Sequence, residues 1–252
     1  MMHILIFGDS HMDTNNLFNV IDYADTRGCK TLLSVGDYGY WPHIEEGREF
    51  LKRISDELIE RDMEIHFIKG NHDNHEYLEQ FSGMEIAEVS PRMFFRPNMT
   101  TWVWGNYTFC SVGGAYSIDG YKRTFGKDKW PNEEISNSDV YASIGVKADI
   151  IISHDCPETV DIDDYLENKR DPMTYGHRMK LQSIVDEIKP QYVIHGHYHE
   201  RFVARGHHPE GKFTNIGLAR NGDGLDLQCL VFDCDSEYHD FTVNSGRRWV
   251  EL

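Results

Sequence analysis

The sequence lacks the usual marks of a secreted, membrane or zinc-ribbon protein. It has no CxxC pair, and its five cysteines are an odd number with no secretion signal before them, so we expect reduced thiols in a cytoplasmic protein. The first apolar run, residues 4–7, is far too short for a signal peptide or a membrane span. Internal repeats, low-complexity tracts and linkers are also missing. We therefore expect residues 1–252 to form a single domain with no membrane partner.

Positive charge is scarce as well. Against 42 aspartates and glutamates there are 25 lysines and arginines, which gives a formal net charge of -17. An acidic surface repels phosphate backbones at long range, and the sequence has no basic patch, so bulk nucleic-acid binding is not expected. A small phosphate substrate is still compatible with this charge, because bound divalent metal ions reverse its sign locally.

Apolar strands and amphipathic helices alternate through the first eighty residues. Strands are predicted at residues 3–8, 31–35 and 63–69, and helices at residues 15–27, 45–60 and 75–81. This alternation indicates an α/β fold with a parallel sheet and right-handed crossovers.

The regular alternation of strands and helices does not continue through the rest of the chain. Residues 93–95, 101–104 and 107–112 are predicted to be neighbouring antiparallel strands, and residues 113–134 a long loop of the kind that is often functional. Further strands are expected at residues 148–153 and 191–194, near Arg201 and Phe213, and at residues 227–232 and 238–243, with a helix at residues 175–188.

Polar motifs follow five of the predicted strands. The motifs are Gly8-Asp9-Ser10-His11, Gly36-Asp37, Gly70-Asn71-His72-Asp73, Ser153-His154-Asp155 and His195-Gly196-His197. Because a sheet collects its strand ends along one edge, we expect these side chains to converge. Carboxylates, imidazoles and an amide oxygen without thiolate suit manganese, iron or zinc. There are more donors than one ion needs, which favours two metal ions that share a bridging carboxylate.

In order, D-x-H, G-D, G-N-H-D, H and G-H-x-H, these motifs resemble those of the calcineurin-like metallophosphoesterase superfamily. The resemblance runs from Asp9 to His197. It implies a four-layer α/β/β/α sandwich of two mixed sheets, with a dinuclear metal site at the C-terminal ends of the strands. The two divalent ions would be Mn²⁺ and/or iron, with Zn²⁺ or Ni²⁺ as alternatives.

The resemblance also implies a role for each residue. The first ion would be held by Asp9, His11 and His197, the second by Asn71, His154 and His195, and Asp37 would bridge them. His72 would be the catalytic residue, in contact with the phosphate and assisting the leaving group. His199 follows two residues after His197, so we expect it on the same strand face, at the rim of the site and not among the ligands.

One position departs from the family pattern. Many members have G-D-x-x-D, in which the second aspartate orients the histidine of the G-N-H motif, but here that place holds Tyr40. The partner of His72 is therefore unassigned. The Arg-Gly of protein phosphatases is also missing, which disfavours that activity.

The long loop carries a second resemblance. Gly-Gly-Ala-Tyr-Ser-Ile-Asp at residues 113–119, followed by Trp130-Pro131 and Glu133-Glu134, is similar to one subgroup of bacterial and phage metallophosphoesterases. This places the loop near the metals and in contact with substrate. The candidate substrate-binding residues are Asn71, His72, Tyr40 and Asp119.

The predicted function is hydrolysis of phosphodiester bonds in small or nucleotide substrates. Two metal ions polarise the phosphoryl oxygens and lower the pKa of a bridging water, so that hydroxide can attack phosphorus. His72 can donate a proton to the leaving oxygen. Two enzymatic alternatives are a phosphomonoesterase and a nuclease of the same superfamily; a metal-binding protein without catalysis is a third alternative. The substrate, the native metals and the oligomeric state are left open.

Overall fold

The computed structural model describes residues 1–162, 172–237, 239 and 241. The predicted alternation over the first eighty residues is confirmed. The elements are β1 (His3–Phe7), α1 (Thr14–Thr26), β2 (Thr31–Ser34), α2 (Glu45–Glu60), β3 (Glu64–Phe67), α3 (His75–Leu78) and the 3-10 turn η1 (Glu79–Phe81). β1, β2 and β3 lie parallel and adjacent.

Two mixed six-stranded sheets pack face to face. The first has the order β12-β1-β2-β3-β5-β4 and the second the order β10-β11-β9-β8-β7-β6. The first sheet is completed by β4 (Ala87–Ser90), β5 (Met93–Phe95) and β12 (Cys229–Asp233), and the second contains β6 (Thr101–Trp104), β7 (Tyr107–Val112), β8 (Ile150–Ser153), β9 (Tyr192–His195), β10 (Phe202–His208) and β11 (Gly211–Gly217).

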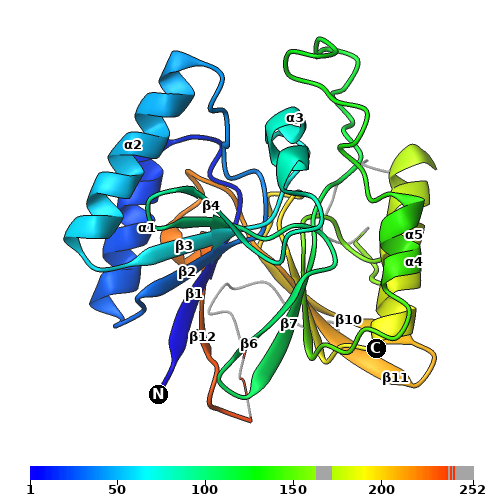
Figure 1. The fold of residues 1–252 in the computed structure, drawn as a ribbon. Helices are drawn as coiled ribbons and strands as arrows, with labels where there is room; N and C mark the ends of the chain where they lie inside the picture. The colour runs from blue at the N-terminus through cyan, green and yellow to red at the C-terminus, as the bar shows by residue number, and fades with distance from the viewer. Residues whose placement is uncertain (163–171, 238, 240, 242–252) are drawn as a thin grey trace.

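Helices cover the outer face of each sheet (Figure 1). α1 and α2 lie over the first sheet, and α4 (Asn137–Ala142) and α5 (Pro172–Ile188) lie over the second. The short α6 (Leu225–Gln228) precedes β12. The predicted four-layer α/β/β/α sandwich is therefore confirmed.

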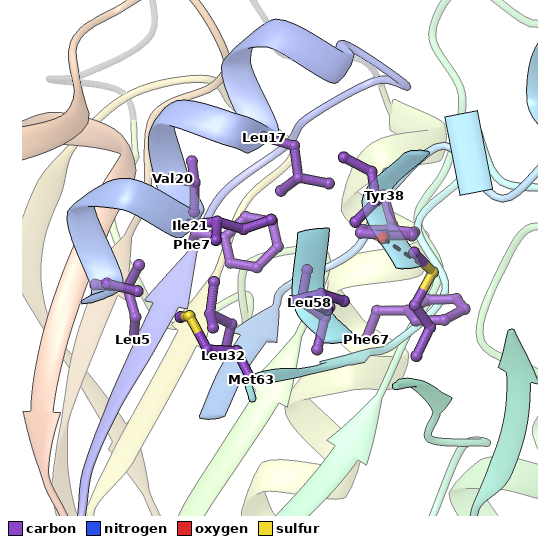
Figure 2. Close-up of a cluster of buried hydrophobic side chains, with 14 of the residues drawn as sticks. Leu5, Phe7, Leu17, Val20, Ile21, Leu32, Tyr38, Leu58, Met63 and Phe67 are labelled. Atoms are coloured by element: carbon purple, nitrogen blue, oxygen red, sulfur yellow. Dashed lines mark hydrogen bonds between the residues drawn. The ribbon is translucent and has the colours of Figure 1, made fainter. Parts of the chain in front are cut away.

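Both faces of each sheet are buried, so apolar side chains point both ways along a strand. In β1, Leu5 and Phe7 join the cluster beneath α1 and α2, and Ile4 and Ile6 join the cluster between the sheets. Figure 2 shows the first cluster, in which Leu17 and Ile21 of α1 come down onto the strands. Adjacent side chains of a strand face opposite sides, which explains why continuous apolar runs mark these strands.

One predicted strand group was partly wrong. β6 and β7 are antiparallel neighbours as expected, but β5 pairs parallel with β3 in the other sheet. Between β5 and β6 the chain crosses from one sheet to the other, with Met99 at a φ of 62°. β4, α4 and α6 were not predicted, because four to six residues are too few to show a period.

The remaining expectations fared as follows. Residues 113–134 form a long loop, with only an isolated bridge between Phe125 and Lys129. The strand expected at residues 238–243 lies mostly outside the described residues. Among the helices in the described ranges, none is long and apolar enough to cross a membrane.

Candidate metal centre

The loops after β1, β2 and β3 are joined by hydrogen bonds from their backbone N–H groups. The Asp37 carbonyl oxygen accepts hydrogen bonds from the N–H groups of Ser10, at 3.2 Å, and His11, at 2.9 Å. Asp73 accepts from Gly39 at 2.8 Å and Tyr40 at 3.0 Å through Oδ1, and from Gly70 at 2.8 Å through Oδ2. These bonds bring the loops that carry the candidate ligands close together.

Two glycines allow this close approach. Gly36 has a φ of 104°, and a Cβ built on it would lie 2.5 Å from His154 Nδ1. A Cβ on Gly70 would lie 2.0 Å from Asp37 Oδ1. Any side chain at either position would push a candidate ligand out of place.

The first group of possible metal donors consists of Asp9, Asp37 and His154, whose donor atoms all lie within 4.8 Å of one another. His154 Nδ1 donates to the Val35 carbonyl oxygen at 2.9 Å, which leaves Nε2 to face the carboxylates. Nε2 lies 3.4 Å from Asp37 Oδ2 and 3.0 Å from Asn71 Oδ1. A carbonyl that fixes the histidine tautomer in this way is the usual support of a metal-binding imidazole.

The second group consists of Asp9, His11 and His199. His199 Nε2 lies 3.1 Å from Asp9 Oδ2 and 3.3 Å from His11 Nε2. Asp9 belongs to both groups. Asp37 also faces both, because its Oδ2 is 3.4 Å from His154 Nε2 and 3.9 Å from His11 Nδ1.

The structure does not bring His195 into either group. Its Nδ1 donates to the Gly196 carbonyl oxygen at 3.0 Å, and its Nε2 accepts from Asn215 Nδ2 at 3.0 Å. Burial lowers the pKa of this ring to about 4. Both ring nitrogens are thus occupied, and the geometry does not support His195 as a ligand.

His199 lies where the sequence interpretation did not expect it. That interpretation assumed a continuous strand, but β9 ends at His195, and His197 and His199 have φ values of 66° and 60°. The His197 ring centroid lies 5.1 Å from that of His154. The signal was present in the sequence, since Gly196-His197-Tyr198-His199 is the stretch that matches G-H-x-H letter for letter.

The two groups of possible metal donors contain buried carboxylates whose negative charge favours a bound cation. Asp9 and Asp37 are 0% and 1% exposed, and the ion pairs that described residues make with them all come from histidines. Burial by itself would raise both carboxyl pKa values, but the neighbouring histidines lower them below the usual range. Burial disfavours protonated His154, yet Asp37 and Asp9 outweigh it and raise the pKa of this imidazole to about 10.

Such a site suits divalent metal ions. The buried carboxylates stay ionised and attract a proton to His154, so a metal ion bound there would replace that proton as the positive charge. Oxygen and nitrogen donors without thiolate are the chemistry of manganese, iron or zinc sites. The residues present therefore fit the group that the sequence implies.

One contact that holds the loop of His197 and His199 in place was not predicted from the sequence. Tyr198, between His197 and His199, donates its hydroxyl to Asp155 Oδ1 at 2.7 Å. His177 Nδ1 of α5 donates to Asp155 Oδ2 at 2.6 Å. Burial would raise the Asp155 pKa, but these partners hold it well below its usual range. The network joins the loop to α5, and no local pattern links residues so far apart in the chain.

His72 stands beside the metal groups and outside both. Its backbone N–H donates to Asp37 Oδ1 at 2.7 Å, and its ring meets that of His11 edge-on at 5.6 Å. Its Nε2 is 3.7 Å from Asp119 Oδ2. The adjacent cavity, of about 330 Å³, is lined by His11, Met12, Asp37, Gly39, Trp41, Ile44 and His72.

The other candidate substrate contacts divide into two kinds. Asn71 faces His154 through its amide oxygen and donates through Nδ2 to Ser117 Oγ at 3.0 Å. Tyr40 is 4% exposed, and its ring lies in the hydrophobic core 5.8 Å from that of Phe67. This buried position of Tyr40 does not support the predicted contact with substrate.

The chain is similar in sequence to a family of known proteins. The family model described as calcineurin-like phosphoesterase matches residues 2–201. A search of curated proteins gave no match.

Three solved structures illustrate the likeness of fold. The crystal structure of TT1561 from Thermus thermophilus is 13% identical, covers 92% of this chain and 99% of its own, and has a TM-score of 0.53. A second crystal structure is 15% identical over 91% and 98%, with a TM-score of 0.52. A third, described as a novel archaeal phosphodiesterase, is 12% identical over 92% and 99%, but its TM-score of 0.40 is too low to support an argument.

Proposed function

The chain belongs to the calcineurin-like phosphoesterase family, and from this premise we propose that it is a metal-dependent phosphodiesterase acting on small or nucleotide substrates. The observation that carries the proposal is the convergence of the buried Asp9 and Asp37 with three histidines, directly beside His72. Members of the family generally bind two divalent metal ions.

The geometry supports a ligand set in which His199 replaces His195 and His197 moves from the first ion to the second. Asp9, His11 and His199 would hold one ion. Asn71, His154 and His197 would hold the other, and Asp37, which faces both groups, would bridge them. Mn²⁺ and iron suit these oxygen and nitrogen donors, with Zn²⁺ and Ni²⁺ as alternatives. When bound, the two ions supply Lewis acidity toward the phosphoryl oxygens and lower the pKa of water.

The residues of the chain then have separate tasks. Asp37 holds the His72 backbone through a 2.7 Å bond, so the imidazole stands at the edge of the metal groups and not among the ligands. From there His72 can give a proton to the oxygen of the departing alcohol as its bond to phosphorus breaks. The value of that proton depends on the leaving group, because an alkoxide is far more basic than a nitrophenolate.

The cavity beside His72 favours a diester over a monoester. The side chains of Met12, Trp41 and Ile44 give it an apolar wall next to the polar groups of His11, Asp37 and His72. A phosphate with two organic substituents could leave one toward solvent and place the other against Trp41. A monoester would leave one of these positions without a substituent.

The proposal is tested on metal-stripped protein reloaded with Mn²⁺. We expect a higher kcat/KM for bis-p-nitrophenyl phosphate than for p-nitrophenyl phosphate, with cyclic nucleotides included in the panel. Trp41→Ala should raise KM for the aryl diester more than for the monoester. A clear monoester preference would instead identify a phosphomonoesterase, hydrolysis of long nucleic acids alone would identify a nuclease, and no turnover with both ions bound would identify a metal-binding protein without catalysis.

The setting of the enzyme is part of the proposal. All five cysteines are free and buried, which suits a reducing compartment such as the cytoplasm. Two sheets that share one core between them support a single domain.

A further inference from the structure

His72 needs a partner for its ring, and the place where the family pattern puts one is taken by Tyr40. The tyrosine ring is buried in the core. The nearby carboxylate of Asp73 accepts three backbone N–H groups with its two oxygens. Asp37 Oδ1 accepts the His72 backbone N–H, and not its ring. None of these groups orients the imidazole.

The long loop at residues 113–134 supplies a carboxylate at the right place. Asp119 Oδ2 lies 3.7 Å from His72 Nε2, and the two side chains are 38% and 36% exposed. Asp119 is itself held by Arg123, whose Nε lies 3.3 Å from Asp119 Oδ1. The carboxylate therefore sits between a permanent cation and the imidazole.

Arg123 is the fixed point of this loop. Its side chain is 8% exposed, and Nη2 forms a 2.7 Å ion pair with Glu133, which is equally buried. Nη1 donates to the Asn71 carbonyl oxygen at 3.2 Å. A guanidinium that contacts two carboxylates and the backbone of a candidate ligand has little freedom to move.

The same loop reaches the Asn71 side chain. Ser117 Oγ accepts from Asn71 Nδ2 at 3.0 Å and donates to Glu133 Oε2 at 2.6 Å. The base of the loop is tied to the end of β3, because the Gly114 N–H donates to the Lys69 carbonyl oxygen at 2.8 Å. The loop thus contacts both residues of the Asn71-His72 pair, each through its own polar partner.

We propose that Asp119 is the positioning residue of His72, and that the loop at residues 113–134 replaces the aspartate that the family usually carries at the place of Tyr40. The inference rests on the proposed function. The Asp119 carboxylate faces Nε2 of the ring at 3.7 Å and attracts it, which leaves the opposite nitrogen, Nδ1, to face the leaving oxygen. When the bond to phosphorus breaks, its electron pair goes to that oxygen, and the proton comes from His72.

The first test compares two diesters that differ in the basicity of the leaving group. Asp119→Asn keeps the shape of the side chain and removes its charge. We expect kcat for a diester with an alkyl or nucleoside leaving group to fall at least about tenfold, which is part of the ~10²–10⁴-fold that general acid catalysis supplies. The aryl diester should lose much less, and metal content measured on the same sample should stay that of the unchanged protein. Asp119→Ala serves as the second variant, with the same expectations.

A double-mutant cycle separates positioning from a general effect on structure. If Asp119 acts through His72, then Asp119→Asn added to His72→Ala should cost nothing further on the alkyl diester. Asp128→Asn is the matched control, since it removes a charge from the same loop, where Asp128 Oδ1 accepts from the Thr124 N–H. This variant should behave as the unchanged protein.

Several results would overturn the inference while the proposed function stands. These are equal losses on the two diesters, additive losses in the cycle, loss of a metal ion from Asp119→Asn, and a higher KM with unchanged kcat, which would make Asp119 a substrate-binding residue. An unchanged protein that hydrolyses no diester, although both metal ions are bound, would overturn the proposed function itself.

Discussion

Exchanging His195 and His199 for asparagine, one at a time, separates metal binding from stability. His199 reaches the Asp9 carboxylate at 3.1 Å from a side chain that is 31% exposed. His195 is fully buried, and its ring bonds to Asn215 and to the Gly196 carbonyl. We expect His199→Asn to weaken binding of one metal ion and His195→Asn to weaken the fold.

The magnitudes follow from these surroundings. Residues that only orient a metal ligand cost ~10–100-fold in affinity when mutated, so a direct donor such as His199 should cost at least about 100-fold, or about 2.8 kcal/mol. Its effect on folding should stay within about 0.5 kcal/mol, as for other surface positions. His195→Asn leaves the Asn215 amide with a poorer acceptor inside the protein, a loss of ~1–3 kcal/mol of stability.

Two measurements distinguish the variants. Elemental analysis after reloading with Mn²⁺ and gel filtration gives the number of ions per chain, and titration calorimetry gives the affinity. Thermal unfolding of the metal-free proteins gives the stability, where 1 kcal/mol corresponds to ~2–4 °C in a chain of this size. His207→Asn, at an exposed position on β10, is the matched control and should change neither quantity. If His195→Asn loses an ion while His199→Asn keeps both, the ligand set predicted from sequence is right and the geometric one is wrong.

Three other predictions concern the site and its support. Asp37→Asn should lose most of the activity and at least one ion, and two tightly held ions with near-normal turnover would contradict its bridging role. The pKa of Asp155 is held below its ordinary value of 3.8 by His177 and Tyr198. The contribution of Asp155 to stability is therefore fully present above pH 3.8 and is lost as the pH falls toward the pKa of the folded state. Asp155→Asn should flatten the acid side of a stability profile measured by urea unfolding, and an unchanged profile would refute this. Thiol reagents should leave turnover of the folded enzyme intact, because all five cysteines are buried and burial raises the pKa of Cys156 far above its usual range; rapid inactivation, with Cys156→Ser inactive too, would show a missed role.

The fold could be predicted from sequence where a local pattern determines it. Continuous apolar strands and the helical faces of α1 and α2 can be read from residues close together in the chain. The partner of β5 could not be predicted, because three residues pair equally well with either sheet, and only the path of the chain around Met99 decides. Sheet assignment of very short strands is a tertiary property.

The site divides in the same way. Asp9, Asp37, Asn71 and His154 follow predicted strands, and the structure brings their side chains together. The proposed ligand set has His199 in place of His195, because the sequence prediction carried the alternation of strand side chains beyond residue 195, where β9 ends. Where residues with positive φ follow a strand, the alternation of side chains no longer indicates which face of the sheet a residue occupies. Asp119 lies in a loop whose sequence has no helical or strand period, so its contact with His72 could not be predicted from a sequence pattern.

Asp73 links the loops after β2 and β3 through three backbone N–H groups, and none of those bonds uses a donor atom of the metal groups. In a zinc finger the cage exists only while the ion is present, so chelation unfolds the domain. Here the bonds from backbone N–H groups to Asp73 join the two loops independently of the candidate metal donors. Chelators should therefore give a folded apoprotein that reloads in one rapid step, and the ions could be exchanged for one another while the chain stays native. The identity of the bound metal would then depend on which divalent ions are available in the surrounding solution, because the protein site keeps the same shape for each of them.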